Sequence, residues 1–241
     1  MSDPESRENR VKKVICSVIF PVYNEEESLE PLLSEVLTVM SGLNKPYEII
    51  FVDDSSSDDS PRILSRFRDE LPEIIRIVTL PERSGQTKAL RVGLDKARGE
   101  VAVTLDADLQ NDPADIPALL QNLEEGFDCV CGWRRDRQDT LVKAALSKLG
   151  NILQRIFTRL TIHDVSCTLR AYRQECIARI PLNWEGQHRF IPLCLSLQGF
   201  KVGEIESHHR ARRFGATKYS HKRIFRVVTD FFRILKAGGK A

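Results

Sequence analysis

The sequence predicts an open α/β fold built on a mostly parallel β-sheet. Two observations predict it: short runs rich in β-branched residues recur along the chain, and the 21 to 27 residues between successive runs carry helical patterns. Apolar strands separated by single helices are typical of βαβ units, in which helices cover both faces of a buried sheet. In chain order, the strands are expected at Val14–Phe20, Glu48–Val52, Ile74–Thr79, Val101–Leu105 and Asp128–Gly132.

Helix signals agree with this pattern. Asn24, followed by three glutamates, predicts an N-cap with acidic residues in the first turn, and Asp112 before Pro113 predicts a second helix start. The second half of the chain is less regular. Its expected elements are a basic amphipathic helix at Thr140–Leu160, a strand at Cys167–Tyr172, a helix at Gln187–Leu197, a strand at Phe200–Glu206 and an amphipathic helix at Arg223–Leu235.

Length and composition fit one globular domain. The 241 residues are 41% hydrophobic and 29% charged, which allows a sizeable core and excludes disordered and disulfide-scaffold classes. We expect a polar tail at 1–13, a globular domain at 14–219 and an amphipathic helix at 220–241. The net charge of +2 requires no nucleic-acid partner, and none is expected. Residues 201–241, however, hold eleven Lys or Arg and three Asp or Glu, so an acidic body carries a basic tail.

Cysteine usage and hydropathy bear on the compartment. The six cysteines form no CxxC pair and are expected to be small buried hydrophobes in a reducing compartment. The polar N-terminus does not have the pattern of a signal peptide. The longest uncharged stretch, Phe190–Phe200, has eleven residues, whereas a membrane-spanning helix needs about twenty. No spanning segment is therefore expected.

Polar segments follow three of the expected strands, where ligands bind in open α/β sheets. They are Pro21–Glu25, Asp53–Asp59 and Asp106–Gln110. Alone, the Asp106-x-Asp108 pair also fits a helix-capping loop. Carboxylates gathered at one sheet edge repel one another unless a cation joins them, and oxygen ligands suit Mg²⁺ or Mn²⁺, whose coordination shell substrate phosphates often complete. The pattern therefore favours a site for a metal-bound diphosphate.

Other reaction classes lack their usual signals. The chain has no GxGxxG after its first strand, no GxxxxGK[ST], no GxSxG and no HExxH. These motifs are typical of dinucleotide binding, nucleotide hydrolysis, serine hydrolysis and zinc proteolysis respectively. None of these activities is expected.

The motifs P-V-Y-N-E at 21–25, D-D-S-S at 53–56 and D-A-D-L-Q at 106–110 resemble those of family 2 glycosyltransferases of the GT-A fold. More narrowly, they resemble polyprenyl-phosphate glycosyltransferases similar to dolichol-phosphate mannose synthase. The likeness runs from about residue 14 to residue 219. Mannose synthases carry small residues where this chain has Cys167–Tyr172. That stretch and the residues at 188–192 are more similar to bacterial undecaprenyl-phosphate sugar transferases, including the aminoarabinose branch, which puts mannose in doubt.

The resemblance implies a donor site with a divalent cation. Its implied donor-binding residues are Pro21, Tyr23, Glu25, Asp53, Arg83, Gly85, Gln86 and Asp106. Mg²⁺ or Mn²⁺ is expected on Asp106 and Asp108, with Gln110 as a further ligand. Turn chemistry alone also accounts for Pro21 and Gly85.

The resemblance also implies a site for the acceptor phosphate. The stretch 209–219 matches the family's H-x-x-R-x-x-G-x-S/T-K-Y loop. Arg forks and a Lys charge suit two phosphate groups that must come together and therefore repel each other. The implied acceptor-phosphate residues are Arg134, Ser166, Arg170, Arg212 and Lys218, and the implied catalytic residues are Asp106, Asp108, Arg212 and Lys218.

The expected reaction is inverting transfer of a sugar from a nucleoside-diphosphate donor (GDP-mannose or a UDP-hexose) to a polyprenyl phosphate (dolichyl or undecaprenyl phosphate). The second pKa of such a phosphate is about 6, so the acceptor is already anionic and a strong general base is less necessary. Two alternatives remain open. One is a related transferase with a polysaccharide or protein acceptor, although its common Q-x-x-R-W element is absent. The other is a catalytically silent nucleotide-sugar-binding protein.

A polyprenyl acceptor implies a membrane. The expected location is cytoplasmic, peripheral at the cytoplasmic face of the membrane, with the Arg223–Leu235 helix either on the lipid surface or packed on the sheet. Many relatives continue into transmembrane helices after the basic loop, so we expect either a shortened chain or a peripheral enzyme. The sequence does not show whether the protein has a protein partner or forms an oligomer.

Overall fold

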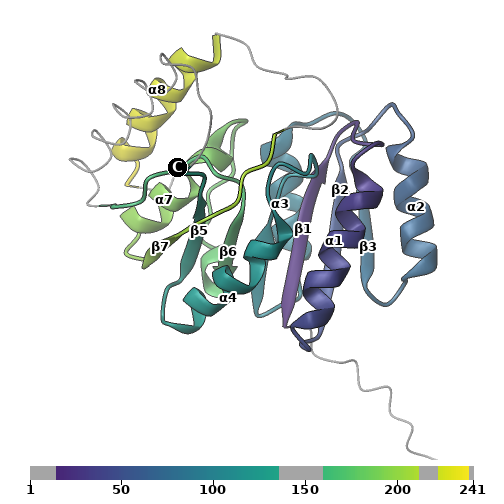
Figure 1. Cartoon of the computed structure of the whole chain (residues 1–241). Helices are drawn as coiled ribbons and strands as arrows, with labels where there is room; N and C mark the ends of the chain where they lie inside the picture. The colour runs from purple at the N-terminus through teal and green to yellow at the C-terminus, as the bar shows by residue number, and fades with distance from the viewer. Residues whose placement is uncertain (1–14, 136–159, 212–221, 239–241) are drawn as a thin grey trace, which may run out of the picture.

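The computed structural model describes residues 15–135, 160–211 and 222–238, and its centre is one seven-stranded sheet in the order β3-β2-β1-β4-β6-β5-β7 (Figure 1). All neighbouring strands are parallel except β6, which is antiparallel to both β4 and β5. The strands are β1 (Cys16–Val22), β2 (Tyr47–Asp53), β3 (Ile75–Thr79), β4 (Val101–Thr104), β5 (Cys129–Trp133), β6 (Arg170–Arg173) and β7 (Val202–Glu206).

Helices lie on both faces of this sheet (Figure 1). The α-helices are α1 (Leu29–Gly42), α2 (Ser60–Glu70), α3 (Gln86–Lys96), α4 (Ile116–Glu124), α6 (Gln174–Ile177), α7 (Ile191–Leu197) and α8 (Lys222–Lys236), and the 3-10 helices are η1 (Pro113–Asp115) and η2 (Gln187–Phe190).

The alternation of side chains along each strand divides the core into two clusters. Val18 and Phe20 of β1 pack in one cluster with apolar residues of α1, α2 and α4. Ile19 points to the opposite face, where it joins residues of α3, α6, α7 and α8. Because successive side chains of a strand point to opposite faces, this arrangement requires strands that are apolar throughout, as the sequence shows.

The predicted strands are confirmed, with bounds that differ by up to three residues, the largest difference being at the start of β6. The prediction of a mostly parallel sheet is confirmed as well, and all six cysteines are buried as expected. The Gln187–Leu197 prediction corresponds to η2 and α7, and the helix predicted at Arg223–Leu235 corresponds to α8. Asp112 caps η1 by accepting a hydrogen bond from the Ala114 backbone N–H. The helix predicted at Thr140–Leu160 lies almost wholly outside the described residues.

The predicted start of the first helix is wrong. Asn24 adopts a φ of +52°, and the helix begins only at Leu29, after Ser28. The Asn24 side chain is occupied elsewhere, because its Oδ1 accepts a hydrogen bond of 2.8 Å from the Ser57 backbone N–H in the loop after β2. The local capping signal therefore serves a contact between two loops at the carboxyl edge of the sheet.

That edge gathers the predicted polar segments. The register pairs Val22 with Asp53 and Asp53 with Thr79, so β1, β2 and β3 end side by side. Thr104 ends β4 next to β1, and the loop that begins at Leu105 leaves the sheet there. Three of the loops predicted to bind ligand thus lie at one edge of the sheet.

Candidate functional site

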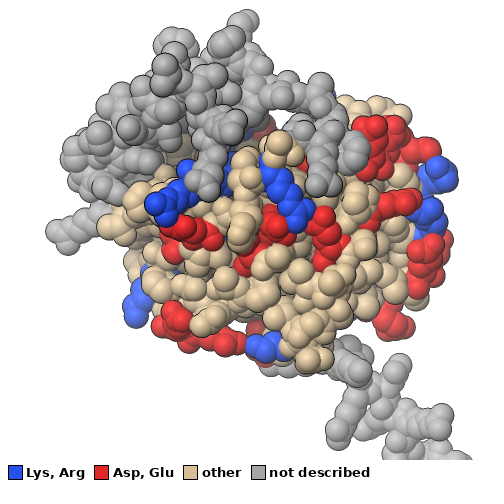
Figure 2. Space-filling model, in the orientation of Figure 1, with Lys and Arg blue, Asp and Glu red and all other residues tan. Residues whose placement is uncertain are grey.

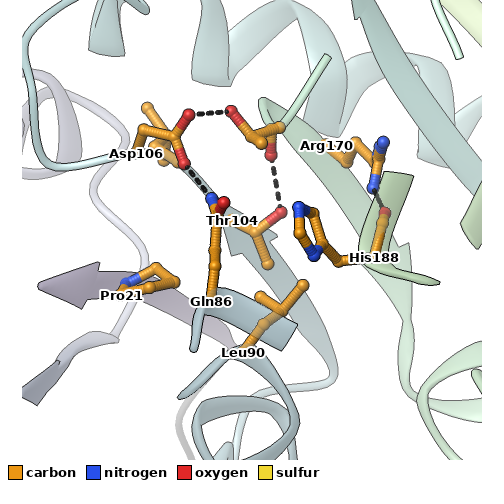
Figure 3. Close-up of a pocket in the computed structure, with 9 residues that line it drawn as sticks. Pro21, Gln86, Leu90, Thr104, Asp106, Arg170 and His188 are labelled. Carbon is orange, nitrogen blue, oxygen red and sulfur yellow. Dashed lines mark hydrogen bonds between the residues drawn. The ribbon is translucent and has the colours of Figure 1, made fainter. Parts of the chain in front are cut away.

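Asp106 is the centre of the candidate site. Its carboxylate is held between two neutral donors: Oδ1 accepts a hydrogen bond from Gln86 Nε2 at 2.7 Å, and Oδ2 accepts one from the Thr168 hydroxyl at 2.8 Å (Figure 3). The Thr104 hydroxyl donates to the Thr168 backbone carbonyl at 2.8 Å and ties the two loops together. Side chains from β4, α3 and the loop before β6 therefore fix one carboxylate.

Burial and the neighbouring charge of Asp108 raise the pKa of Asp106 to about 6. The hydrogen bond from Thr168 and the positive charges of Arg134 and Arg170 oppose this increase but do not cancel it. An ionised Asp106 is thus under-compensated by the protein, and a cation at this place would relieve the repulsion.

The residues around Asp108 fit the expected cation. Asp108 is 6% exposed, and its Oδ1 accepts a hydrogen bond from the Gln110 backbone N–H at 3.1 Å. Within the described part of the chain, no group of three or more His, Cys, Asp or Glu side chains is placed to hold a metal ion. Two carboxylates on one loop suit a cation such as Mg²⁺ or Mn²⁺ that completes its shell with water and substrate phosphate.

A small pocket lies beside Asp106 (Figure 3). Three of its lining residues, Pro21, Gln86 and Asp106, are predicted donor-binding residues. His188 projects into it from the side opposite Asp106, with its ring toward Thr104 (Figure 3). The full lining comprises Pro21, Gln86, Leu90, Thr104, Leu105, Asp106, Thr168, Arg170 and His188.

Asp53, predicted to contact the nucleoside, lies at the end of β2 and is 1% exposed. Its Oδ1 accepts a hydrogen bond from the Ser56 backbone N–H at 3.1 Å. Its Oδ2 is buried and has no hydrogen-bond partner among the residues that the structure describes. A buried carboxylate oxygen without a partner is costly, and an N–H group of a nucleobase is a suitable donor to it.

The loop before α3 carries two further donor-site predictions, Arg83 and Gly85, next to Gln86 at the start of the helix. Its backbone is held by Asp54, which accepts hydrogen bonds from the N–H groups of Ser84 at 2.7 Å and Gly85 at 2.8 Å. The Arg83 guanidinium lies over the Tyr23 ring, 4.0 Å from its centroid. The structure therefore brings the 83–86 loop onto the segment that follows β1. Glu25 lies on the same segment, half-buried, and its Oε2 accepts a hydrogen bond from Ser28.

Arg134 and Ser166, predicted to bind the acceptor phosphate, lie together. Arg134 forms a two-pronged ion pair with Asp164, at 2.7 and 3.0 Å, and also donates to the Ser166 hydroxyl at 3.1 Å. The Arg134 charge is close enough to Asp106 to oppose the increase in its pKa. Ser166 also lies two residues before Thr168, whose hydroxyl donates to Asp106, so one loop joins the predicted acceptor cluster to the predicted metal site.

Arg170 does not fit the predicted phosphate contact. It is 1% exposed, and its guanidinium donates to the backbone carbonyls of His188 at 2.8 Å and Val165 at 2.7 Å. These bonds tie two loops to β6, so the geometry favours a structural role at the wall of the pocket over direct binding of phosphate.

Arg212 and Lys218 lie outside the described residues. The segment just before them is joined to the loop that follows Asp106 and Asp108: the Arg210 backbone N–H donates to the Gln110 carbonyl at 2.8 Å, and the Arg210 guanidinium pairs with Glu35 at 2.8 Å and Asp112 at 2.5 Å. In Figure 2, Asp and Glu side chains gather, together with some Lys or Arg, on the side of the molecule formed by α1 and α2.

Sequence reasoning missed Thr168, His188 and Asp54. Asp54 stands beside the predicted Asp53, and Thr168 lies between the predicted Ser166 and Arg170. Both residues therefore lie within predicted motifs, but the sequence gives neither of them a role. No local signal shows that the Thr168 hydroxyl binds a carboxylate 62 residues earlier. His188 enters the pocket only because its segment folds back onto α3.

Comparison with known proteins adds an independent finding. Residues 17–180 match the family described as Glycosyl transferase family 2. The chain is 38% identical over 225 residues to undecaprenyl-phosphate 4-deoxy-4-formamido-L-arabinose transferase of Salmonella typhimurium, covering 93% of this chain and 68% of the relative. It is also 38% identical over 230 residues to the protein of the same name from Serratia proteamaculans, covering 95% of this chain and 70% of the relative.

Solved structures with low sequence identity share the fold. Glucosyl-3-phosphoglycerate synthase from Mycobacterium tuberculosis, solved with Mn²⁺, UDP-glucose and phosphoglyceric acid, superposes with a TM-score of 0.72 at 19% identity, over 98% of this chain and 86% of the other. A mannosyltransferase from Pyrobaculum calidifontis, solved with GDP-mannose and Mn²⁺, gives a TM-score of 0.59 at 22% identity, over 83% and 58% of the two chains. The predicted GT-A-type α/β fold is thereby confirmed.

Proposed function

The chain belongs to glycosyltransferase family 2, and on that premise we propose that it moves a sugar from a nucleoside-diphosphate donor to a polyprenyl phosphate of the undecaprenyl type. The observation that carries the proposal is the juxtaposition of a pair of carboxylates and a guanidinium that stands beside a hydroxyl. Asp106 and Asp108 stand at the end of β4, and Arg134 with Ser166 lies beside them. A donor diphosphate with its cation suits the first group, and an acceptor phosphate suits the second.

The donor diphosphate is proposed to lie along the carboxyl edge of the sheet. Asp106 and Asp108, with Gln110 as a further candidate, would hold Mg²⁺ or Mn²⁺, which supplies charge neutralisation for the leaving diphosphate. Asp53 would accept a hydrogen bond from the nucleoside through its unpartnered Oδ2. Tyr23 and Arg83, already in contact with each other, are proposed to flank the same nucleoside.

The residues of this chain orient and neutralise the reactants. Asp164 holds the Arg134 guanidinium in place, and the remaining N–H groups of Arg134 would donate to the acceptor phosphate. Arg212 and Lys218 are proposed to join it from the segment that follows Ala211. Direct displacement by the acceptor oxygen inverts the anomeric carbon. An anionic phosphate needs no strong base, so alignment supplies most of the required acceleration.

The name of the relatives guides the choice of sugar. They are transferases of 4-deoxy-4-formamido-L-arabinose, and we propose a sugar of this modified type as the first donor to test, ahead of mannose. The experiment is a panel of UDP-hexoses, GDP-mannose and a UDP-linked formamido-arabinose, each with Mn²⁺ or Mg²⁺ and a short-chain polyprenyl phosphate. Transfer to the lipid phosphate from one donor supports the proposal. Hydrolysis without transfer, or transfer only to a polysaccharide or protein, contradicts it.

A polyprenyl acceptor requires contact with a membrane, and α8 is the proposed surface. No helix in the described ranges is long and apolar enough to cross a bilayer. In α8, Ile234 is fully buried and Phe231 packs against the core, whereas Phe232 is 50% exposed. We propose that α8 lies at the cytoplasmic face of the membrane with Phe232 toward the lipid, where nearby basic residues each add about 1 kcal/mol on an anionic surface.

A further inference from the structure

One wall of the pocket is held in place by a segment from a distant part of the chain. Residues 184–190, hereafter the 184–190 segment, pack against the first turn of α3 from a distant part of the chain. Glu185 Oε2 accepts a hydrogen bond of 3.0 Å from the Thr87 backbone N–H, across 98 residues of sequence. The N-cap of α3 is Gly85, which has no side chain to serve the free N–H groups of the first turn. Glu185 takes the place of that missing cap.

Glu185 also lies directly over Gly85. A Cβ atom on Gly85 would stand 2.6 Å from Glu185 Oε2, a distance at which one of the two must move. Gly85 further has a φ of +92°, which L-residues rarely adopt. The conformation of the loop thus requires glycine, and a larger residue would also push the Glu185 carboxylate away from the Thr87 N–H.

Thr87 makes the second connection between the two segments. Its hydroxyl accepts a hydrogen bond from the Gly186 backbone N–H at 2.9 Å and lies 2.6 Å from His188 Nδ1. Arg170 holds the other side of the segment by donating to the His188 carbonyl. His188, at the wall of the pocket, is therefore fixed from both α3 and β6.

The position of the first turn of α3 also affects Asp106. Gln86 is the first residue of α3, and its side-chain amide donates to Asp106 Oδ1 at 2.7 Å. A shift of the first turn would move this amide. We propose that Glu185 is a positioning residue for the donor site: it caps α3 from outside and so orients Gln86 and Asp106 toward the metal-bound diphosphate. This inference rests on the function proposed above.

Glu185 is well suited to a test because it is exposed, so its truncation opens no cavity in the core. Glu185→Gln retains an oxygen that can accept the Thr87 N–H, whereas Glu185→Ala removes it. Glu175→Ala, at an exposed glutamate of α6, is the matched control. The measurement is calorimetric titration of each protein with UDP and with GDP in the presence of MnCl₂, together with the melting temperature.

For the nucleotide that wild type binds, Glu185→Ala should weaken affinity about fivefold, the equivalent of one lost helix cap. Glu185→Gln and Glu175→Ala should bind as wild type does. Thr87→Val should also weaken affinity, and Thr87→Ser, which keeps the hydroxyl, should restore it. Wild-type affinity in Glu185→Ala overturns the proposal, as does equal loss in Glu185→Gln or Glu175→Ala. If wild type itself binds neither UDP nor GDP, the proposed function fails instead.

Discussion

Replacement of Asp106 by asparagine should stabilise the metal-free protein at neutral pH while it abolishes sugar transfer. Burial and the charge of Asp108 raise the pKa of Asp106 from 3.8 to about 6, so its ionised form is less favourable in the folded protein than in the unfolded chain. Asparagine has nearly the same shape and carries no charge. The variant therefore removes a repulsion that the fold otherwise tolerates in the absence of a cation.

The magnitude follows from the pKa and the hydrogen bonds. At 1.36 kcal/mol per pKa unit, the difference between 3.8 and about 6 corresponds to about 3 kcal/mol of lost stability at pH 7.5. Asparagine replaces one of the two oxygens with an NH₂ group, so the bond from either Gln86 or Thr168 is lost, at a cost of about 1 kcal/mol. The expected net gain in the free energy of unfolding is about 2 kcal/mol.

The sign of the pH dependence is fixed by the direction of the pKa change. Because the folded pKa lies above the unfolded one, the contribution of Asp106 to stability is fully present below pH 3.8 and is lost as the pH rises toward 6. The advantage of the variant should therefore shrink to less than about 1 kcal/mol at pH 5.

Urea unfolding of both proteins in EDTA at pH 5 and pH 7.5 measures this difference. Glu48→Gln is the matched control, since Glu48 is 2% exposed but accepts hydrogen bonds from Ser17, the Arg98 backbone N–H and Arg76. Burial acts to raise the pKa of Glu48, yet these partners lower it below its ordinary value. The same chemical change should therefore destabilise the protein at Glu48. An Asp106→Asn variant that is less stable than wild type at pH 7.5, or equally shifted at both pH values, would refute the reasoning.

Three further predictions concern the metal, the acceptor and the membrane. Asp108→Ala should lower transfer on the order of a hundredfold or more and weaken Mn²⁺ binding measured by calorimetry, because one carboxylate of the pair is lost; wild-type turnover with a normal melting curve contradicts the metal assignment. Arg134→Lys keeps the charge but loses the fork to Asp164, so transfer should fall roughly tenfold with nucleotide affinity unchanged; a fall in nucleotide affinity alone would place Arg134 on the donor. Phe232→Asp should reduce sedimentation with anionic liposomes without changing the melting temperature, whereas Phe231→Asp should lower that temperature because Phe231 packs on the core; unchanged binding by Phe232→Asp rules out this face as the membrane surface.

The strands could be predicted because their determinants are local. Each is a short run of β-branched and apolar residues, and burial on both faces leaves such a run few other conformations. The start of α1 could not be predicted in the same way. Asn24 with three following glutamates is a good local capping signal, but a contact with Ser57 stabilises a positive φ instead. Tertiary hydrogen bonds decided the outcome, and they are not visible in a window of sequence.

In the candidate site, too, local patterns could be predicted and tertiary contacts could not. The Asp106–Asp108 pair and its place at a strand end could be predicted, because acidic residues after a buried strand are a local pattern. Arg170 was placed on the acceptor phosphate by its motif alone. Its actual partners are backbone carbonyls, one of them at His188, 18 residues later. Which hydrogen-bond donor meets which acceptor depends on how separate loops pack against one another. The tertiary structure sets this packing, and a local sequence motif does not show it.

The charges around Asp106 fit the role proposed for it, because its carboxylate accepts hydrogen bonds but has no direct ion pair among the described residues. Glu48 stands near the amino end of β2 and Asp106 follows the carboxyl end of β4, and the protein surrounds the first with arginines and the second with neutral donors. Two arginines do stand close to Asp106, but Arg134 is engaged by Asp164 and Arg170 by backbone carbonyls. Their charges lower the pKa of Asp106 only in part. A direct ion pair would have satisfied Asp106 and removed its affinity for a cation. Because other partners restrain both arginines, neither pairs directly with Asp106. Negative charge therefore remains on the side proposed for the donor, and the Arg134 guanidinium, balanced by Asp164, stays on the side proposed for the acceptor phosphate.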